Sequence, residues 1–169
     1  MLGGVLGDVS FDIYGPAEDA VYWSECQKLI SALPPNVRVE YQGQIEHEDI
    51  ARVFGEHDLF LFPTLGENFG HVICEALLAG CPVLISDQTP WRGLQDRGAG
   101  WDVPVDDNDR FSAILQQCID ADEEWYTPLR ANAAEFARAY VADSGVIEAN
   151  RRLFANTKGD LGEEFSMGQ

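Results

Sequence analysis

The chain has 169 residues, of which 46% are hydrophobic and 24% charged, as expected for one globular domain with its own core. With 11 basic and 29 acidic residues, its net charge of −18 argues against a nucleic-acid-binding surface and against docking on anionic membranes. No apolar run is long enough to cross a bilayer, and no secretion signal opens the chain. The four cysteines lack a C-x-x-C spacing, so we expect reduced thiols in a cytoplasmic protein.

Short apolar segments alternate with segments of helical periodicity along the chain. The first kind predicts strands over 9–14, 37–41, 59–62 and 83–85, with an edge strand or extended segment over 98–105. The second predicts helices over 19–33, 48–54, 69–79, 107–119, 122–140 and 146–156. Residues 158–169 show no periodicity, so we expect a flexible tail after a domain over 1–157.

This alternation predicts an α/β fold, a doubly wound Rossmann-like parallel sheet with helices at its C-terminal end. In such a fold, ligands bind at the edge formed by the carboxyl ends of the strands. We therefore expect Gly15, Gly43, the 63–68 loop and the 86–92 loop to line that edge.

The segment over 62–82 places a Gly-containing loop between a buried strand and an apolar helix. The first-turn amides of that helix would face the ligand edge and suit an anion. Glu75 is the only acid of this helix, so we expect it to be buried and to need a partner. That partner is either a ligand, such as a vicinal diol, or a structural group such as Arg92 or backbone amides.

Glu67 lies eight residues before Glu75, about two helical turns, so both carboxylates are expected to face the same way. The alternative for Glu67 is a loop acid that caps the following helix. His71 is either packed against the helix or in contact with a ligand. Arg92 suits either a phosphate or a surface ion pair.

The run G-E-N-F-G-H-V-I-C-E-A-L-L-A-G-C-P-V-L-I-S, over 66–86, resembles the signature of family 4 retaining glycosyltransferases of the GT-B fold. It holds two glutamates separated by seven residues, Phe-Gly after the first, and Glu-Ala-x-x-x-Gly-x-Pro-Val. The resemblance extends over 9–105 and includes a Y-x-G turn at 41–43, which lies beside the nucleotide base in this family.

The resemblance implies roles for individual residues toward a UDP- or GDP-sugar donor, with no cofactor and no metal. Glu67 would be the catalytic carboxylate that faces the transferred sugar, and Glu75 would bind the ribose hydroxyls. The loop whose amides meet the sugar and diphosphate would be formed by Asn68, Phe69 and Gly70. The base would be contacted through the backbone of Gly43, Gln44 and Ile45.

The resemblance also implies parts that these 169 residues do not match. They are an N-terminal acceptor-binding domain, a basic segment that neutralises the diphosphate, and the central strand between 9–14 and 59–62. We therefore expect the donor-binding half of an enzyme that transfers a hexosyl group to a glycan or lipid, inactive by itself. The strands over 9–14 and 59–62 would pair directly, recruit residues 1–6 or another chain's strand, or leave the chain marginally stable and aggregation-prone or oligomeric.

Two readings compete with an enzyme half. The first is a non-catalytic α/β module that keeps the nucleotide pocket or only the fold. The second is a phosphoreceiver-like signalling domain, which would require a lysine after the last core strand. Because Ser86-Asp87 is followed by no lysine, the second reading is disfavoured.

Overall fold

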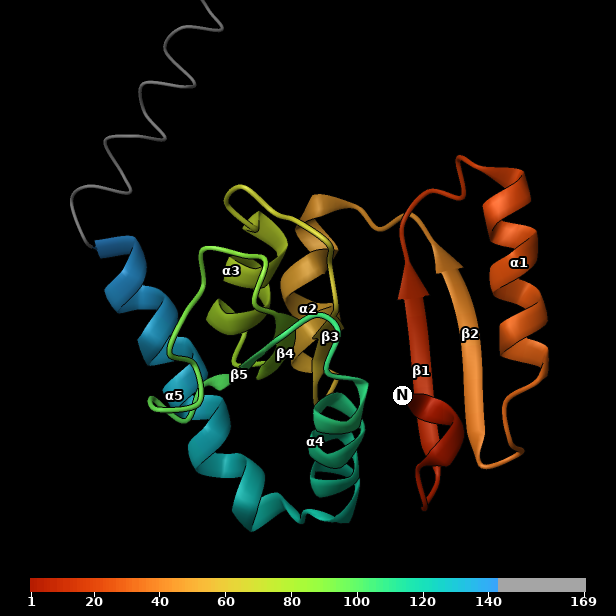
Figure 1. Ribbon diagram of the computed structural model, residues 1–169. Helices are drawn as coiled ribbons and strands as arrows, with labels where there is room; N and C mark the ends of the chain where they lie inside the picture. The colour runs from red at the N-terminus through yellow and green to blue at the C-terminus, as the bar shows by residue number, and fades with distance from the viewer. Residues whose placement is uncertain (143–169) are drawn as a thin grey trace, which may run out of the picture.

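The computed structural model describes residues 1–142, which form parallel strands flanked by helices (Figure 1). Strands β1 (Val9–Tyr14) and β2 (Val37–Gly43) pair in parallel, with Val9 opposite Val37. Helix α1 (Ala20–Ser31) connects them and lies beyond β2 in Figure 1. The Asp19 carboxylate caps α1 by accepting hydrogen bonds from two first-turn amides.

A second parallel sheet contains β3 (Phe60–Phe62), β4 (Val83–Ser86) and β5 (Gly100–Val103), with β4 in the centre. Its connecting helices are α2 (Ile50–Gly55), which follows a 3-10 turn η2 (His47–Asp49), and α3 (His71–Leu78). Helices α4 (Asn108–Asp120) and α5 (Glu123–Ala142) complete the described chain. The predicted edge strand is thus confirmed as β5, and the predicted helices that fall within residues 1–142 agree within a few residues.

The core lies around β4, whose four residues are all fully buried. On one side pack the apolar face of α3, the Trp91 indole and the alanines of α5. On the other pack Trp101, Phe111 and the inner face of α4. Helix α1 contributes no buried residue, so the first sheet is much less covered than the second.

The predicted parallel α/β architecture is confirmed, but its strands form two sheets instead of one. Within residues 1–142 no backbone hydrogen bond joins β1 to β3, so the direct pairing of these strands that we considered is absent. Residues 1–6 do not fill the gap either, because Leu2–Gly4 forms a 3-10 turn, η1, that contacts α4.

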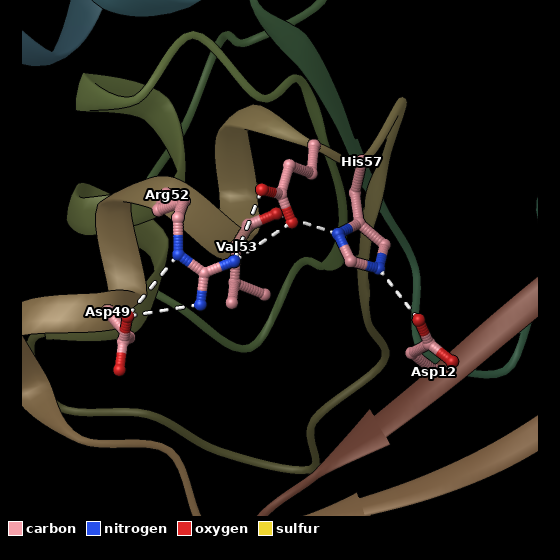
Figure 2. Close-up of polar contacts among 6 residues, drawn as sticks. Asp12, Asp49, Arg52, Val53 and His57 are labelled. Atoms are coloured by element: carbon pink, nitrogen blue, oxygen red, sulfur yellow. Dashed lines mark hydrogen bonds and ion pairs between the residues drawn. The ribbon is translucent and has the colours of Figure 1, made fainter.

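A side-chain contact links β1 of the first sheet to the turn between α2 and β3 (Figure 2). His57, in the turn after α2, places Nε2 3.1 Å from Oδ2 of Asp12 on β1. Its Nδ1 lies 2.7 Å from the carbonyl of Val53, which fixes the ring. A hydrogen bond from the Gln42 amide and the contact with His57 lower the pKa of Asp12, although partial burial opposes them. Asp12 is therefore held as a carboxylate.

Two expectations lie outside the described residues: the helix over 146–156 and the tail over 158–169. The four cysteines are all unpaired, and three of them, Cys74, Cys81 and Cys118, are buried. Among the helices of residues 1–142, none combines the length and the apolar character that a membrane span requires.

Candidate functional site

The loop over 63–70 connects β3 to α3 and is held in place by the residues that follow β4. The Glu67 amide donates to the Gln88 carbonyl at 3.0 Å. The fully buried Trp91 donates its indole N–H to the Phe69 carbonyl at 2.6 Å. The Ser86 hydroxyl donates to the Thr64 carbonyl. The two loops predicted to share the ligand edge therefore do meet, at the carboxyl ends of β3 and β4.

Gly70 sets where α3 begins. Its φ of +76° is left-handed, a conformation that glycine adopts without the steric cost of a Cβ. A Cβ there would lie 2.8 Å from Ile73 Cδ1 and 3.1 Å from the Trp91 indole nitrogen. Glycine is thus required both by the turn and by the close approach of neighbouring side chains.

Glu67 lies in the loop and not on a helix, because α3 starts only at His71. The expectation that helical spacing makes Glu67 and Glu75 face the same way is therefore wrong, because only Glu75 belongs to the helix. The Glu67 carboxylate accepts a hydrogen bond from the Phe69 amide at 3.3 Å. It therefore caps a loop amide, while the helix has no side-chain cap at Gly70.

Glu75 is less buried than its apolar surroundings predicted. Its side chain is 30% exposed, and Oε1 lies 3.6 Å from Nδ1 of His47 in the η2 turn. The expected structural partner Arg92 instead donates to the backbone carbonyl of Asp87. The burial expectation was wrong because the 44–49 connection covers Glu75 only partly. The carboxylate therefore remains partly accessible to solvent beside the η2 turn.

The segment predicted to contact a base, Gly43 to Ile45, approaches this edge from the first sheet. Gly43 ends β2 with a φ of +75°, and its carbonyl accepts the Gly15 amide at 2.8 Å. Gln44 is exposed, whereas Ile45 lines a cavity of about 290 Å³ together with Val72 of α3. With His47 beside Glu75, the connection after β2 and the first half of α3 therefore converge.

Three consecutive backbone amides at the start of α3 have no hydrogen-bond partner among the described residues: Gly70, His71 and Val72. Such amides, at the positive end of a helix dipole, suit an anionic group. The exposed His71 ring lies against the Phe69 ring, with centroids 4.5 Å apart and the planes tilted by 46°, and the neighbouring Asn68 is exposed. Over residues 1–142, no cluster of three or more His, Cys, Asp or Glu side chains is arranged to hold a metal ion.

Sequence reasoning missed two residues that shape this edge. Trp91 holds the 63–70 loop through its hydrogen bond to the Phe69 carbonyl. The only sequence signal for it was a tryptophan within a loop expected at the ligand edge. His47 of η2 lies beside Glu75 of α3. An isolated histidine in the sequence gives no signal of such a long-range contact.

Comparisons with known proteins place this geometry in a family. The family model for glycosyl transferases group 1 matches residues 6–140. A phosphatidyl-myo-inositol mannosyltransferase of Mycolicibacterium smegmatis is 33% identical over 124 residues, which are 72% of this chain and 31% of that protein. The chain thus spans about a third of the length of such curated relatives.

Solved structures of this fold agree with the family model. Anabaena Alr3699/HepE in complex with UDP-glucose superposes with a TM-score of 0.70 at 24% identity, covering 93% of this chain and 43% of that one. Sucrose-phosphate synthase from Thermosynechococcus elongatus gives 0.63 at 26% identity, covering 89% and 39%. The matched region includes every element from β1 to α4 and nearly all of α5. The chain belongs to the group 1 glycosyltransferases, which have the GT-B fold.

Proposed function

We propose that this chain binds the nucleoside-diphosphate-sugar donor of a retaining glycosyltransferase, which transfers a hexosyl group to a glycan or lipid in polysaccharide biosynthesis. The observation that carries the proposal is the loop–helix junction at Gly70, where three consecutive amides have no partner among residues 1–142 and begin the helix that carries the partly exposed Glu75. The mannosyltransferase relatives and the UDP-glucose complex of Alr3699/HepE support a nucleotide sugar as the ligand.

In this proposal, the diphosphate binds at the amides of Gly70, His71 and Val72. The chain's net charge of −18 repels a donor at long range, so local hydrogen bonds must supply the affinity. Amides in fixed positions also stabilise the negative charge that develops on a departing diphosphate. Phe69 contributes its amide only when the Glu67 carboxylate releases it.

Glu75 binds the ribose in this proposal, because each carboxylate oxygen can accept one hydroxyl proton of a vicinal diol. Gly43, Gln44 and Ile45 contact the base through their backbone, on the side of Glu75 where His47 lies. Glu67 is the catalytic candidate beside the transferred sugar, and Asn68 lies next to it in the exposed part of the loop. No cofactor enters the proposal, since the donor itself carries the sugar and the leaving group.

The test is calorimetric titration of the chain with UDP and with GDP. Glu75→Gln keeps the side-chain shape but removes the charged acceptor, whose hydrogen bonds contribute about 1.5–3 kcal/mol. We expect affinity for the preferred nucleotide to fall at least about tenfold, because 1.4 kcal/mol corresponds to a factor of ten. Glu25→Gln, with the same charge change on the exposed surface of α1, should leave affinity unchanged.

The same titration distinguishes the competing function, a non-catalytic module that keeps only the fold. No binding of either nucleotide, with the fold intact, would support it. Equal loss of affinity in the Glu75 and Glu25 variants would refute the ribose role of Glu75.

A further inference from the structure

The peptide group between Phe69 and Gly70 has its carbonyl turned toward the core. The Trp91 indole, which is fully buried, donates its N–H to that carbonyl at 2.6 Å. Within residues 1–142 the Phe69 carbonyl has no second hydrogen-bond donor. In a trans peptide, as this one is, the carbonyl and the N–H point in opposite directions. The Gly70 N–H is therefore directed away from the Trp91 indole.

The next peptide group along the chain is oriented by the helix itself. The Gly70 carbonyl accepts from the Ile73 and Cys74 amides at 3.0 and 3.1 Å, so it points along α3. The His71 N–H consequently points the other way, out of the N-terminus of the helix. Backbone hydrogen bonds thus secure the direction of the His71 amide, whereas the direction of the Gly70 amide depends on one side chain.

Gly70 is the residue at which the Phe69–Gly70 peptide group could turn over. Rotating this group by half a turn would exchange the Gly70 φ of +76° for a negative value, and glycine adopts both. The rotated group would present the Phe69 carbonyl oxygen where the amide now lies. A carbonyl oxygen repels an anion, whereas an amide binds it. The Trp91 hydrogen bond selects the orientation that suits an anion.

The Trp91 side chain is itself firmly held. Its ring stacks against Tyr140 of α5, with centroids 4.1 Å apart and planes inclined by 27°. Phe136, one turn earlier on α5, has its ring centroid 6.2 Å from that of Trp91. The Trp91 backbone N–H donates to the Thr89 hydroxyl at 3.2 Å. A donor that is fixed at both its ring and its backbone can fix the orientation of its acceptor.

We propose that Trp91 is a positioning residue for the donor diphosphate: by holding the Phe69 carbonyl, it keeps the Gly70 amide directed toward the phosphate oxygens. This role rests on the proposed function, because it concerns the same loop–helix junction. Packing alone would not require an indole, since a phenylalanine ring is also apolar and aromatic. Loss of the indole N–H therefore weakens the phosphate contacts and leaves the ribose and base contacts intact.

The experiment compares a nucleoside diphosphate with its nucleoside, by NMR titration of the full chain and of Trp91→Phe. We expect Trp91→Phe to lower the affinity for UDP or GDP, whichever the unmodified chain prefers, at least about tenfold. The affinity for the corresponding nucleoside, uridine or guanosine, should stay the same. Trp101→Phe is the matched control on the other side of β4, where Trp101 stacks against Trp125, and it should change neither affinity.

The titrations separate the possible failures. Equal losses of affinity for the diphosphate and the nucleoside would give Trp91 a merely structural role and overturn the proposal. If Trp91→Phe binds the diphosphate as tightly as the unmodified chain does, the positioning role fails and the proposed function stands. If the unmodified chain binds neither UDP nor GDP, the proposed function fails and this role fails with it.

Hydrogen exchange on the unmodified chain decides the proposal even if Trp91→Phe unfolds. Because the diphosphate would bind the state in which the Trp91 indole N–H is hydrogen-bonded, its binding should slow exchange of that proton. We expect the preferred nucleotide to slow the Trp91 indole proton at least about tenfold more than the Trp101 indole proton, which reports general stabilisation. Equal slowing of the two protons would overturn the proposal.

Discussion

Replacing Gly70 by alanine should destabilise the chain more than the same change at Gly43 or at Gly66. The left-handed φ of +76° costs a residue with a Cβ about 1–2 kcal/mol. The new methyl group would also lie 2.8 Å from Ile73 Cδ1 and 3.1 Å from Trp91 Nε1. Both neighbours are fully buried and cannot move freely, so overpacking adds about 1–3 kcal/mol. We expect a total loss of about 2–5 kcal/mol.

Two glycines of the same chain separate these contributions. Gly43→Ala has a φ of +75° but open space around the new Cβ, so it should cost only the conformational part, about 1–2 kcal/mol. Gly66→Ala, in the same loop as Gly70, has neither a positive φ nor a neighbour within 4 Å. It should be neutral or stabilise by up to about 1 kcal/mol through the unfolded state.

The assay is urea unfolding followed by circular dichroism, with the free energy of unfolding compared at equal slope. The expected order of stability is Gly66→Ala, then Gly43→Ala, then Gly70→Ala. Equal losses at Gly66 and Gly70 would refute the account of the loop. Equal losses of unfolding free energy at Gly43 and Gly70 would show that the close approach of Trp91 does not constrain position 70.

Three further predictions concern other parts of the chain. Trp91→Phe keeps an aromatic ring in the core but removes the donor to the Phe69 carbonyl, so urea titration should show a loss of at least about 1 kcal/mol. Burial raises the pKa of the Cys81 thiol to about 12, so mass spectrometry after mild alkylation of the folded chain should show Cys26 modified and Cys81 intact. Because the folded state lowers the pKa of Asp12 below 3.8, its contribution to stability is present above pH 3.8 and lost as the pH falls through the lowered pKa. Asp12→Asn should make the acid limb of a stability–pH curve shallower, and an unchanged limb would contradict the assignment.

Most of the fold could be predicted because local signals agreed with the tertiary structure. The apolar run before Pro63 forms a strand as predicted, although it is half-buried and not fully buried as expected, and Asp19 caps α1 at the expected end. The start of α3 was misplaced by two residues, because apolar periodicity does not reveal the left-handed backbone at Gly70. That error also produced the wrong helical argument for Glu67.

The long-range features of the site could not be predicted from spacing alone. The approach of His47 to Glu75 depends on how the connection after β2 crosses α3. The support of Phe69 by Trp91 joins residues 22 positions apart, across two loops. Neither contact leaves a periodic pattern in the sequence.

The measurement that most directly tests the central claim is backbone amide NMR of the chain titrated with UDP and with GDP. If the loop–helix junction binds the donor, one nucleotide should shift the amides of Gly70, His71 and Val72 in a saturable manner, together with those of Gly43 to Ile45. Saturable shifts confined to α1 or α4, with the junction unchanged, would contradict the account.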